Sequence, residues 1–149
     1  MVTFTSLLAS TLGLLASTAP LLASAQMLGV IETNPQYFDS RTCYDGAKTH
    51  SIVDFGGSHA PSTGSTCTNR GTVLSIQGGS SNSLDTSCTA GRWSNGYKFC
   101  VIWNTPMVVR PDGRVMSCSA DDTMIFNCPS SQPCWVNKMR KYKCSGTWA

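Results

Sequence analysis

Large aliphatic side chains are scarce through most of this 149-residue chain. From residue 26 onward, leucine, isoleucine, valine and phenylalanine together supply 20 of 124 residues. Such a composition is typical of disordered chains when net charge is high, but the formal net charge here is only +3. A hydrophobic core alone is therefore excluded as the source of stability, and the length excludes a large two-domain enzyme.

Residues that build familiar catalytic sites are equally scarce. Glu32 is the only glutamate, and Asp121 and Asp122 are adjacent, so no evident pair of carboxylates flanks a glycosidic bond. Phosphate-binding glycine loops and dinucleotide fingerprints are absent. Residues 56–60 (Gly-Gly-Ser-His-Ala) only approximate a nucleophile elbow, and their surroundings have the composition of a surface loop. The sequence thus excludes the common nucleotide-binding classes and indicates no specific activity.

The first 31 residues carry no charged side chain, and an apolar run that begins at residue 7 ends in Ala23-Ser24-Ala25. Small residues at these positions are what signal peptidase accepts, so we expect residues 1–25 to be a cleaved signal peptide. A membrane anchor is the alternative, but Pro20 interrupts the run and Ser, Thr and Ala are frequent in it. We therefore expect residues 26–149 to form a single secreted domain without an integral membrane segment.

Cysteine is the abundant residue that balances these absences. All eight cysteines follow the apolar run, and an even number in an oxidising compartment predicts four intramolecular disulfides. Each bridge typically stabilises a fold by about 2–4 kcal/mol, but spacing alone leaves the pairing open. No Cys-x-x-Cys pair occurs, so we expect no metal and no cofactor. The predicted disulfide residues are Cys43, Cys67, Cys88, Cys100, Cys118, Cys128, Cys134 and Cys144.

Short segments of alternating polar and apolar residues lie between stretches rich in Gly, Ser, Asn and Pro, and no long helical periodicity is present. We predict a mainly β fold, a small disulfide-stapled antiparallel sandwich or barrel with room for one short helix. Residues 26–42 are expected to be an irregular lead-in with a turn at Asn34-Pro35. Residues 135–144 fit a helix or a strand. Strands are predicted at residues 51–55, 71–77, 97–103 and 123–127.

Two of these local predictions are specific enough to test. In residues 97–103, a period of two places Tyr97, Phe99, Val101 and Trp103 on one face, which we expect to be core, while Cys100 on the other face can tether a neighbour. Residues 111–113 (Pro-Asp-Gly) predict a three-residue hairpin loop with Gly113 in the left-handed conformation. This loop pairs Val109 with Val115 and opposes Arg110 and Arg114, with Asp112 or an external anion between the two arginines.

The only histidines are His50 and His59, and Asp54 lies between them. Two histidines and a carboxylate can cleave RNA by acid–base catalysis. If residues 51–55 form a strand, His50 shares a face with Asp54, so a small nuclease-like hydrolase that uses His50, Asp54 and His59 is one hypothesis. Two ordinary exposed histidines are the simpler interpretation.

The strongest concentration of positive charge lies near the end of the chain, with aromatic residues beside it. Such a patch can meet phosphates, anionic lipids or acidic polysaccharides, so we predict a binding surface. The alternative is a solvated face that keeps the protein soluble. The predicted binding residues are Trp135, Lys138, Arg140, Lys141, Tyr142 and Lys143.

The layout of this chain combines an apolar leader with 124 further residues that contain an even number of cysteines and no catalytic motif. In that layout it resembles the small secreted cysteine-rich proteins of filamentous fungi, many of which act as effectors, or virulence factors, in the plant apoplast. The resemblance implies a protein that binds a host protein or a cell-wall polysaccharide, and we expect a monomer. Fungal effectors with ribonuclease-like or killer-toxin-like folds are similar in size, so a hydrolase and an antimicrobial or killer-type toxin are alternatives. The Gly/Ser-rich loops at residues 56–65 and 78–87 are further candidates for contact with a partner.

Overall fold

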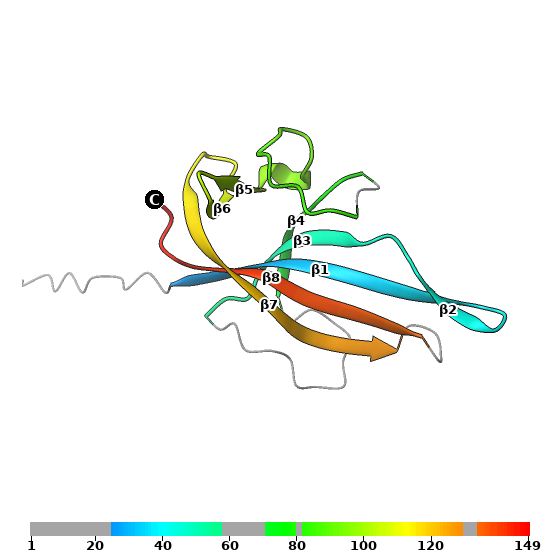
Figure 1. Ribbon diagram of the computed structural model, residues 1–149. Helices are drawn as coiled ribbons and strands as arrows, with labels where there is room; N and C mark the ends of the chain where they lie inside the picture. The colour runs from blue at the N-terminus through cyan, green and yellow to red at the C-terminus, as the bar shows by residue number, and fades with distance from the viewer. Residues whose placement is uncertain (1–24, 58–70, 80–81, 130–133) are drawn as a thin grey trace, which may run out of the picture.

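The computed structural model describes residues 25–57, 71–79, 82–129 and 134–149. Eight strands form one antiparallel sheet that curls into a half-barrel, so the prediction of a mainly β, disulfide-linked antiparallel fold is confirmed (Figure 1). The elements are β1 (Gln26–Asp39), β2 (Thr42–Asp45), β3 (Thr49–Asp54), β4 (Thr72–Ile76), the 3-10 turn η1 (Ser94–Gly96), β5 (Lys98–Ile102), β6 (Thr105–Val109), β7 (Val115–Pro129) and β8 (Trp135–Gly146).

The strand order in the sheet is β4-β3-β1-β8-β7-β6-β5, and β2 pairs with the far end of β1. The strands predicted at residues 51–55, 71–77 and 123–127 correspond to β3, β4 and part of β7, and residues 135–144 form a strand rather than a helix. The first residues of β7 pair with β6, and the rest of β7 pairs with β8, which carries the sheet around its curl. Within the part of the chain just specified, no helix is long and apolar enough to cross a membrane.

The expected irregular lead-in is in fact strand β1, an interior strand of the sheet, so that prediction was wrong. β1 pairs with β3 on one side and with β8 on the other. Its apolar residues Leu28, Val30 and Ile31 are buried against both faces, and a strand buried on both faces lacks the alternation that marks a strand with one wet face.

Pro35 lies inside β1 rather than in the predicted turn. Its carbonyl accepts a hydrogen bond from the N–H of Gly46 at 2.8 Å. At this point the pairing with β3 has ended at Thr33 and the pairing with β2 has yet to begin at Gln36. Pro35 is also in register with Val136 of β8, but its carbonyl faces the β2 side, and an N–H at this residue would face the same side. The missing N–H therefore falls in the gap between the β3 and β2 ladders, which is why the strand tolerates proline.

The main core cluster lies between the inner face of the sheet and the β5–β6 hairpin. In this cluster the ring of Phe99 lies 4.5 Å from the ring of Tyr142, measured between centroids. A smaller cluster of Ile31, Val53 and Ile125 forms on the opposite face of the sheet. The buried residues of the main cluster are Leu28, Val30, Ile52, Trp93, Phe99, Val108, Met116 and Cys144.

The structure corrects one part of the predicted β5 face. Phe99 is fully buried as expected, but Trp103 is 93% exposed. The strand ends at Ile102, and Trp103 and Asn104 form the two-residue turn to β6, with φ of 51° and 60°. Such a turn requires positive φ at both positions, so it directs the tryptophan side chain away from the core.

The predicted Pro-Asp-Gly hairpin is confirmed. Val109 pairs with Val115, and Gly113 has a φ of +87°. The carboxylate of Asp112 lies 2.7 Å from the guanidinium of Arg110 and 3.7 Å from that of Arg114. The aspartate therefore relieves the repulsion between the two opposed arginines.

Three of the four expected disulfides lie within the described residues. Cys43–Cys134 joins β2 to the start of β8, Cys88–Cys100 joins a loop to β5, and Cys118–Cys144 joins β7 to β8. Cys100 thus tethers the second face of β5, as the alternation predicted. The side chains of Cys67 and Cys128 lie outside the described residues, so the fourth bridge stays a prediction.

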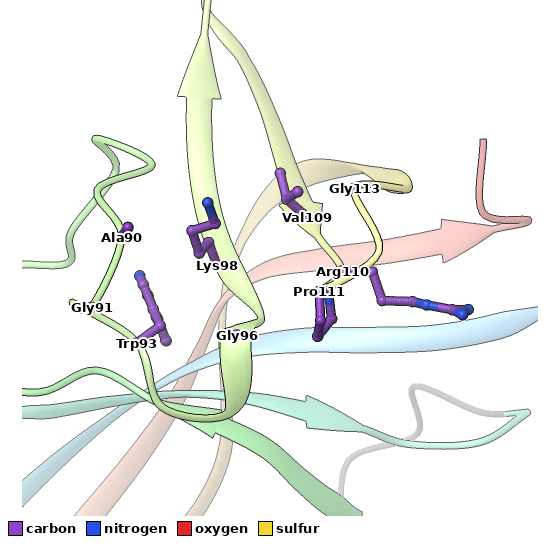
Figure 2. Close-up of a pocket in the computed structure, with 9 residues that line it drawn as sticks. All are labelled: Ala90, Gly91, Trp93, Gly96, Lys98, Val109, Arg110, Pro111 and Gly113. Carbon is purple, nitrogen blue, oxygen red and sulfur yellow. The ribbon is translucent and has the colours of Figure 1, made fainter.

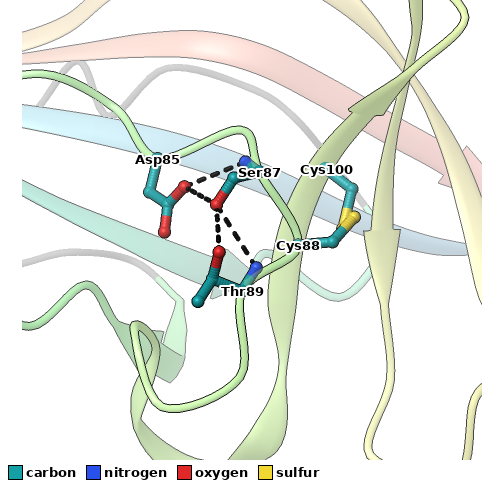
Figure 3. Close-up of a disulfide and its surroundings, with 5 residues drawn as sticks. All are labelled: Asp85, Ser87, Cys88, Thr89 and Cys100. Atoms are coloured by element: carbon teal, nitrogen blue, oxygen red, sulfur yellow. Dashed lines mark hydrogen bonds between the residues drawn. A yellow bond between two sulfur atoms is a disulfide. The ribbon is translucent and has the colours of Figure 1, made fainter.

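Figure 3 shows that short polar contacts build the loop around Cys88. The Asp85 carboxylate accepts hydrogen bonds from the backbone N–H of Ser87 at 2.9 Å and from its hydroxyl at 2.6 Å, and that hydroxyl lies 2.6 Å from the hydroxyl of Thr89. The buried side chain of Gln77 donates to the Ser83 carbonyl and accepts from the Asp85 N–H. These hydrogen bonds and the disulfide stabilise the loop and substitute for the regular backbone pairing of a strand.

Candidate functional site

The predicted basic binding residues lie on β8, in the interior of the sheet, and two of these cations are ion-paired. Arg140 is only 6% exposed and pairs with Asp121, while Lys141 pairs with Asp122. Burial raises the pKa of Asp121, but its hydrogen bonds with Arg140 and Thr123 outweigh this effect and leave the pKa below its usual value. The hydrogen bond to Asp122 raises the pKa of Lys141. Sequence reasoning missed these pairs because β7 and β8 meet only in the fold.

The remaining members of the predicted patch point in different directions. Tyr142 packs against the main core, and Lys143 is exposed. Burial lowers the pKa of Lys138. Trp135 is exposed at the opposite end of β8 from Lys143. The six residues are therefore divided among the core, the ion pairs and the two ends of the strand, and binding through them stays a prediction.

His50 does not have the exposed position of an ordinary surface histidine, because it is only 1% exposed. It lies directly across from Glu32 in the β1–β3 ladder, with its Nε2 3.2 Å from a Glu32 carboxylate oxygen. Lys48 Nζ lies 3.2 Å from the other oxygen of the same carboxylate. The Asp54 carboxylate instead accepts hydrogen bonds from the Gln26 side chain and the backbone N–H of Gly56. His59 lies outside the described residues.

The charge state of the Lys48–Glu32–His50 cluster follows from its burial. Burial lowers the pKa of His50 more than the neighbouring Glu32 raises it. Burial raises the pKa of Glu32, but hydrogen bonds from Asn34, Lys48 and His50 together bring it below its usual value. At neutral pH the carboxylate is therefore charged, and the neutral imidazole donates its Nε2–H to it. A catalytic base must lie within hydrogen-bond reach of the reacting group, so the burial of His50 does not favour that role, and catalysis through His50 stays a prediction.

A different group of side chains is presented to solvent where β1 and β2 extend beyond the core. We call residues 36–45 the aromatic arm. Figure 1 shows this hairpin at the end of the sheet away from β5 and β6. Tyr37 and Tyr44 are directly opposite each other in the ladder, with ring centroids 5.8 Å apart, and they are 50% and 52% exposed. Phe38 in the arm and Trp135 on β8 are also large exposed apolar side chains.

The aromatic arm is held firmly although its rings are exposed. The Cys43–Cys134 disulfide ties it to the start of β8. The ring of Tyr37 lies over Gly46, where any side chain would collide with it. On the opposite face of the hairpin, the Gln36 amide donates a hydrogen bond to the Asp45 carboxylate at 3.0 Å. A fixed aromatic surface is suited to binding, because little conformational entropy is lost when a ligand docks on it.

Sequence reasoning missed the aromatic arm because it assigned residues 26–42 to an irregular lead-in. The available signal was the pair of tyrosines, Tyr37 and Tyr44, on either side of a short polar turn, which is typical of a hairpin. No protein-family model matches the chain, and comparisons with curated proteins and with solved structures found no match.

Proposed function

We propose that this protein is a secreted, cysteine-rich, effector-like protein that binds a cell-wall polysaccharide through the aromatic arm. The observation that carries the proposal is the pair of neighbouring, half-exposed tyrosine rings on a hairpin fixed by a disulfide. Exposed aromatic side chains that form a contiguous surface mark an interaction site more reliably than isolated ones.

The chemistry of the aromatic arm favours a sugar over an apolar protein surface. Sugar rings have apolar C–H faces that stack on flat aromatic rings, and hydroxyl edges that need hydrogen-bond partners. Tyr37 and Tyr44 offer both a ring face and a phenolic hydroxyl on the same face of the hairpin. An entirely apolar partner would leave the two phenolic hydroxyls without water or a hydrogen bond, at a free-energy cost.

Binding is favoured over catalysis because of where the acid–base groups lie. His50, the histidine of the hydrolase hypothesis that the structure describes, is buried and pairs with Glu32 rather than with Asp54. A toxin that acted on anionic membranes through the basic residues of β8 would need their charges free, and Arg140 and Lys141 pair with aspartates. A partner-binding role requires neither group to reach solvent.

The experiment is a depletion assay with purified protein and insoluble cellulose, chitin and beta-glucan, and affinity electrophoresis in gels containing pectin. We expect the wild type to bind at least one polymer, and the double variant Tyr37→Ala/Tyr44→Ala to lose that binding. The matched control, Tyr37→Phe/Tyr44→Phe, keeps the rings and should retain most of it. A second control is Trp103→Ala, which removes an exposed aromatic ring far from the arm. Equal binding by the alanine variant, or capture of a host protein with no affinity for any polymer, would overturn the proposal.

A further inference from the structure

A second possible binding site lies at the other end of the molecule, between the loop before η1 and the β5–β6 hairpin. It is a pocket with a volume of about 280 Å³, and its lining includes Gly91, Trp93, Lys98, Val109, Arg110 and Pro111. Figure 2 shows these residues around the pocket, with Trp93 and Lys98 on neighbouring sides of it. None of the residues of the aromatic arm lines it.

Trp93 presents an unused hydrogen-bond donor here. The residue is only 5% exposed, and its indole Nε1 is buried with no acceptor in hydrogen-bond distance. The indole N–H can only donate, and buried polar groups in folded proteins nearly always have a partner. In Figure 2 the nitrogen of Trp93 and the amine of Lys98 both lie on the side of the pocket away from the underlying sheet. An acceptor on this side of the pocket would satisfy the indole N–H.

The charges around the pocket are of one sign. Its lining contains Lys98 and Arg110 and no carboxylate. Arg110 is already engaged, because it pairs with Asp112 at 2.7 Å and lies over the ring of Trp148 at 5.5 Å from its centroid. Among the residues that the structure describes, no carboxylate lies within ion-pair distance of Lys98. Lys98 and the Trp93 N–H are thus the two groups available to a ligand, and both require an anion or another acceptor.

We propose that this Trp93–Lys98 pocket binds the carboxylate of an acidic sugar residue. One carboxylate oxygen would accept from the indole N–H of Trp93, and the other would pair with the ammonium of Lys98. Val109 and Pro111 give the pocket apolar walls against which the ring of a sugar can pack, which a bare inorganic anion would leave unused. The proposal deepens the proposed polysaccharide binding by naming an acidic polymer, but it concerns a separate site and can fail separately.

The direct test is an NMR titration that follows the tryptophan indole N–H resonances of the 15N-labelled protein. The variants Trp103→Phe, Trp135→Phe and Trp148→Phe identify three of the four resonances and leave that of Trp93, so the buried tryptophan itself stays intact. A galacturonate trimer should shift the Trp93 resonance in a saturable way, and a galactose trimer of the same ring number should not. No shift, an equal shift with the neutral trimer, or an equal shift with inorganic phosphate would overturn the proposal.

The charge requirement has its own pair of variants. Lys98→Met keeps the length of the side chain but removes the charge, and it should weaken galacturonate binding about tenfold, as expected for the loss of a charge-assisted contact. Lys48→Met removes a lysine that does not line the pocket and belongs to neither proposed binding surface, and it should leave the affinity unchanged. Tyr37→Ala/Tyr44→Ala should leave the galacturonate-dependent shift of the Trp93 resonance unchanged, because that resonance reports on this pocket alone, and this distinguishes failure of the pocket from failure of the aromatic arm. Unchanged affinity in Lys98→Met, or tighter binding of an acidic peptide than of the trimer, would contradict the assignment.

Discussion

The two ends of strand β1 serve different purposes, although they belong to one continuous strand. Near its start, Leu28, Val30 and Ile31 are almost completely buried in the two core clusters. Near its end, Tyr37 and Phe38 are about half exposed, and the aromatic arm is fixed by backbone pairing and by Cys43–Cys134. Apolar burial therefore holds the core end, whereas a covalent bridge holds the arm and leaves its aromatic rings available to a ligand.

This difference shows how a chain with few aliphatic residues can still present large aromatic side chains. Disulfides restrict the unfolded chain without requiring buried side chains, so the aromatic rings of the arm are not needed to stabilise it. We expect substitutions at the core end to change stability, and substitutions in the arm to change binding. The following predictions test that separation, from the largest expected effect to the smallest.

The largest effect should come from the core. Phe99→Ala removes a fully buried ring from the main cluster and should destabilise the protein by about 3–5 kcal/mol, through lost burial and the cavity left behind. Tyr44→Ala in the arm should cost about 1 kcal/mol or less, because the ring is half exposed. Chemical denaturation of both variants measures the two values. Similar losses would show that the arm contributes to the fold as the core does.

Removing a disulfide of the core end should rank second. The double variant Cys118→Ala/Cys144→Ala should lose about 2–4 kcal/mol of stability, since the unfolded chain gains freedom that the bridge now restricts. The comparison variant, Cys43→Ala/Cys134→Ala, should speed hydrogen exchange in β2 while β5 stays protected. Loss of protection in β5 together with β2 in the comparison variant would contradict the separation.

A smaller effect is expected at the β6–β7 turn beside the core. Gly113 has a φ of +87°, so Gly113→Val should destabilise by about 1 kcal/mol or more through backbone strain. Gly57→Val is the matched control, because Gly57 has open space around it and no left-handed backbone. Thermal melts of the two variants should differ clearly. Equal midpoints would mean that this turn adapts without cost.

The smallest expected effect is the dependence of stability on pH. It arises between the two ends of β1, where Glu32 contacts His50. Because the pKa of His50 is lower in the folded protein, the unfolded chain binds the proton more readily, and stability should fall as the pH decreases below about 6.5. Glu32, whose folded pKa is also lowered, contributes stability above its unfolded pKa that is lost only at more acidic pH.

The test of this titration is a comparison of Tm at several pH values between 7 and 5 for the wild type and His50→Gln. The glutamine side chain does not titrate, so its variant should show a flatter profile over that interval, whatever its absolute stability. Parallel profiles would mean that His50 does not control the acid sensitivity in this range.

Local chemistry made part of the fold predictable. The Pro-Asp-Gly turn fixes its own hairpin, because Pro111 and Gly113 favour the backbone conformations that the loop requires. The cysteines likewise predicted a bridged scaffold, but their pairing depends on which strands become neighbours. Strand β1 was missed because its burial on both faces removes the alternation and because Pro35 resembles a turn signal.

The candidate sites depend on long-range pairing, which local patterns do not contain. Glu32 reaches His50 only through the β1–β3 register, and Arg140 reaches Asp121 only through β7 and β8. The exposure of Tyr37 likewise depends on β2 folding back beside β1 and on the core ending before it. Sequence reasoning therefore found the basic residues of the tail, but not the aspartates that neutralise two of them.

The central claim is that the aromatic arm binds a polysaccharide without stabilising the fold. The most direct measurement is of polymer affinity and Tm on the same preparations of wild type, Tyr37→Ala/Tyr44→Ala and Phe99→Ala, below the midpoints of all three. We predict that the arm variant loses binding with a nearly unchanged Tm, and that the core variant keeps binding with a much lower Tm. An arm variant that keeps its affinity, or whose Tm falls as far as that of Phe99→Ala, would contradict this account.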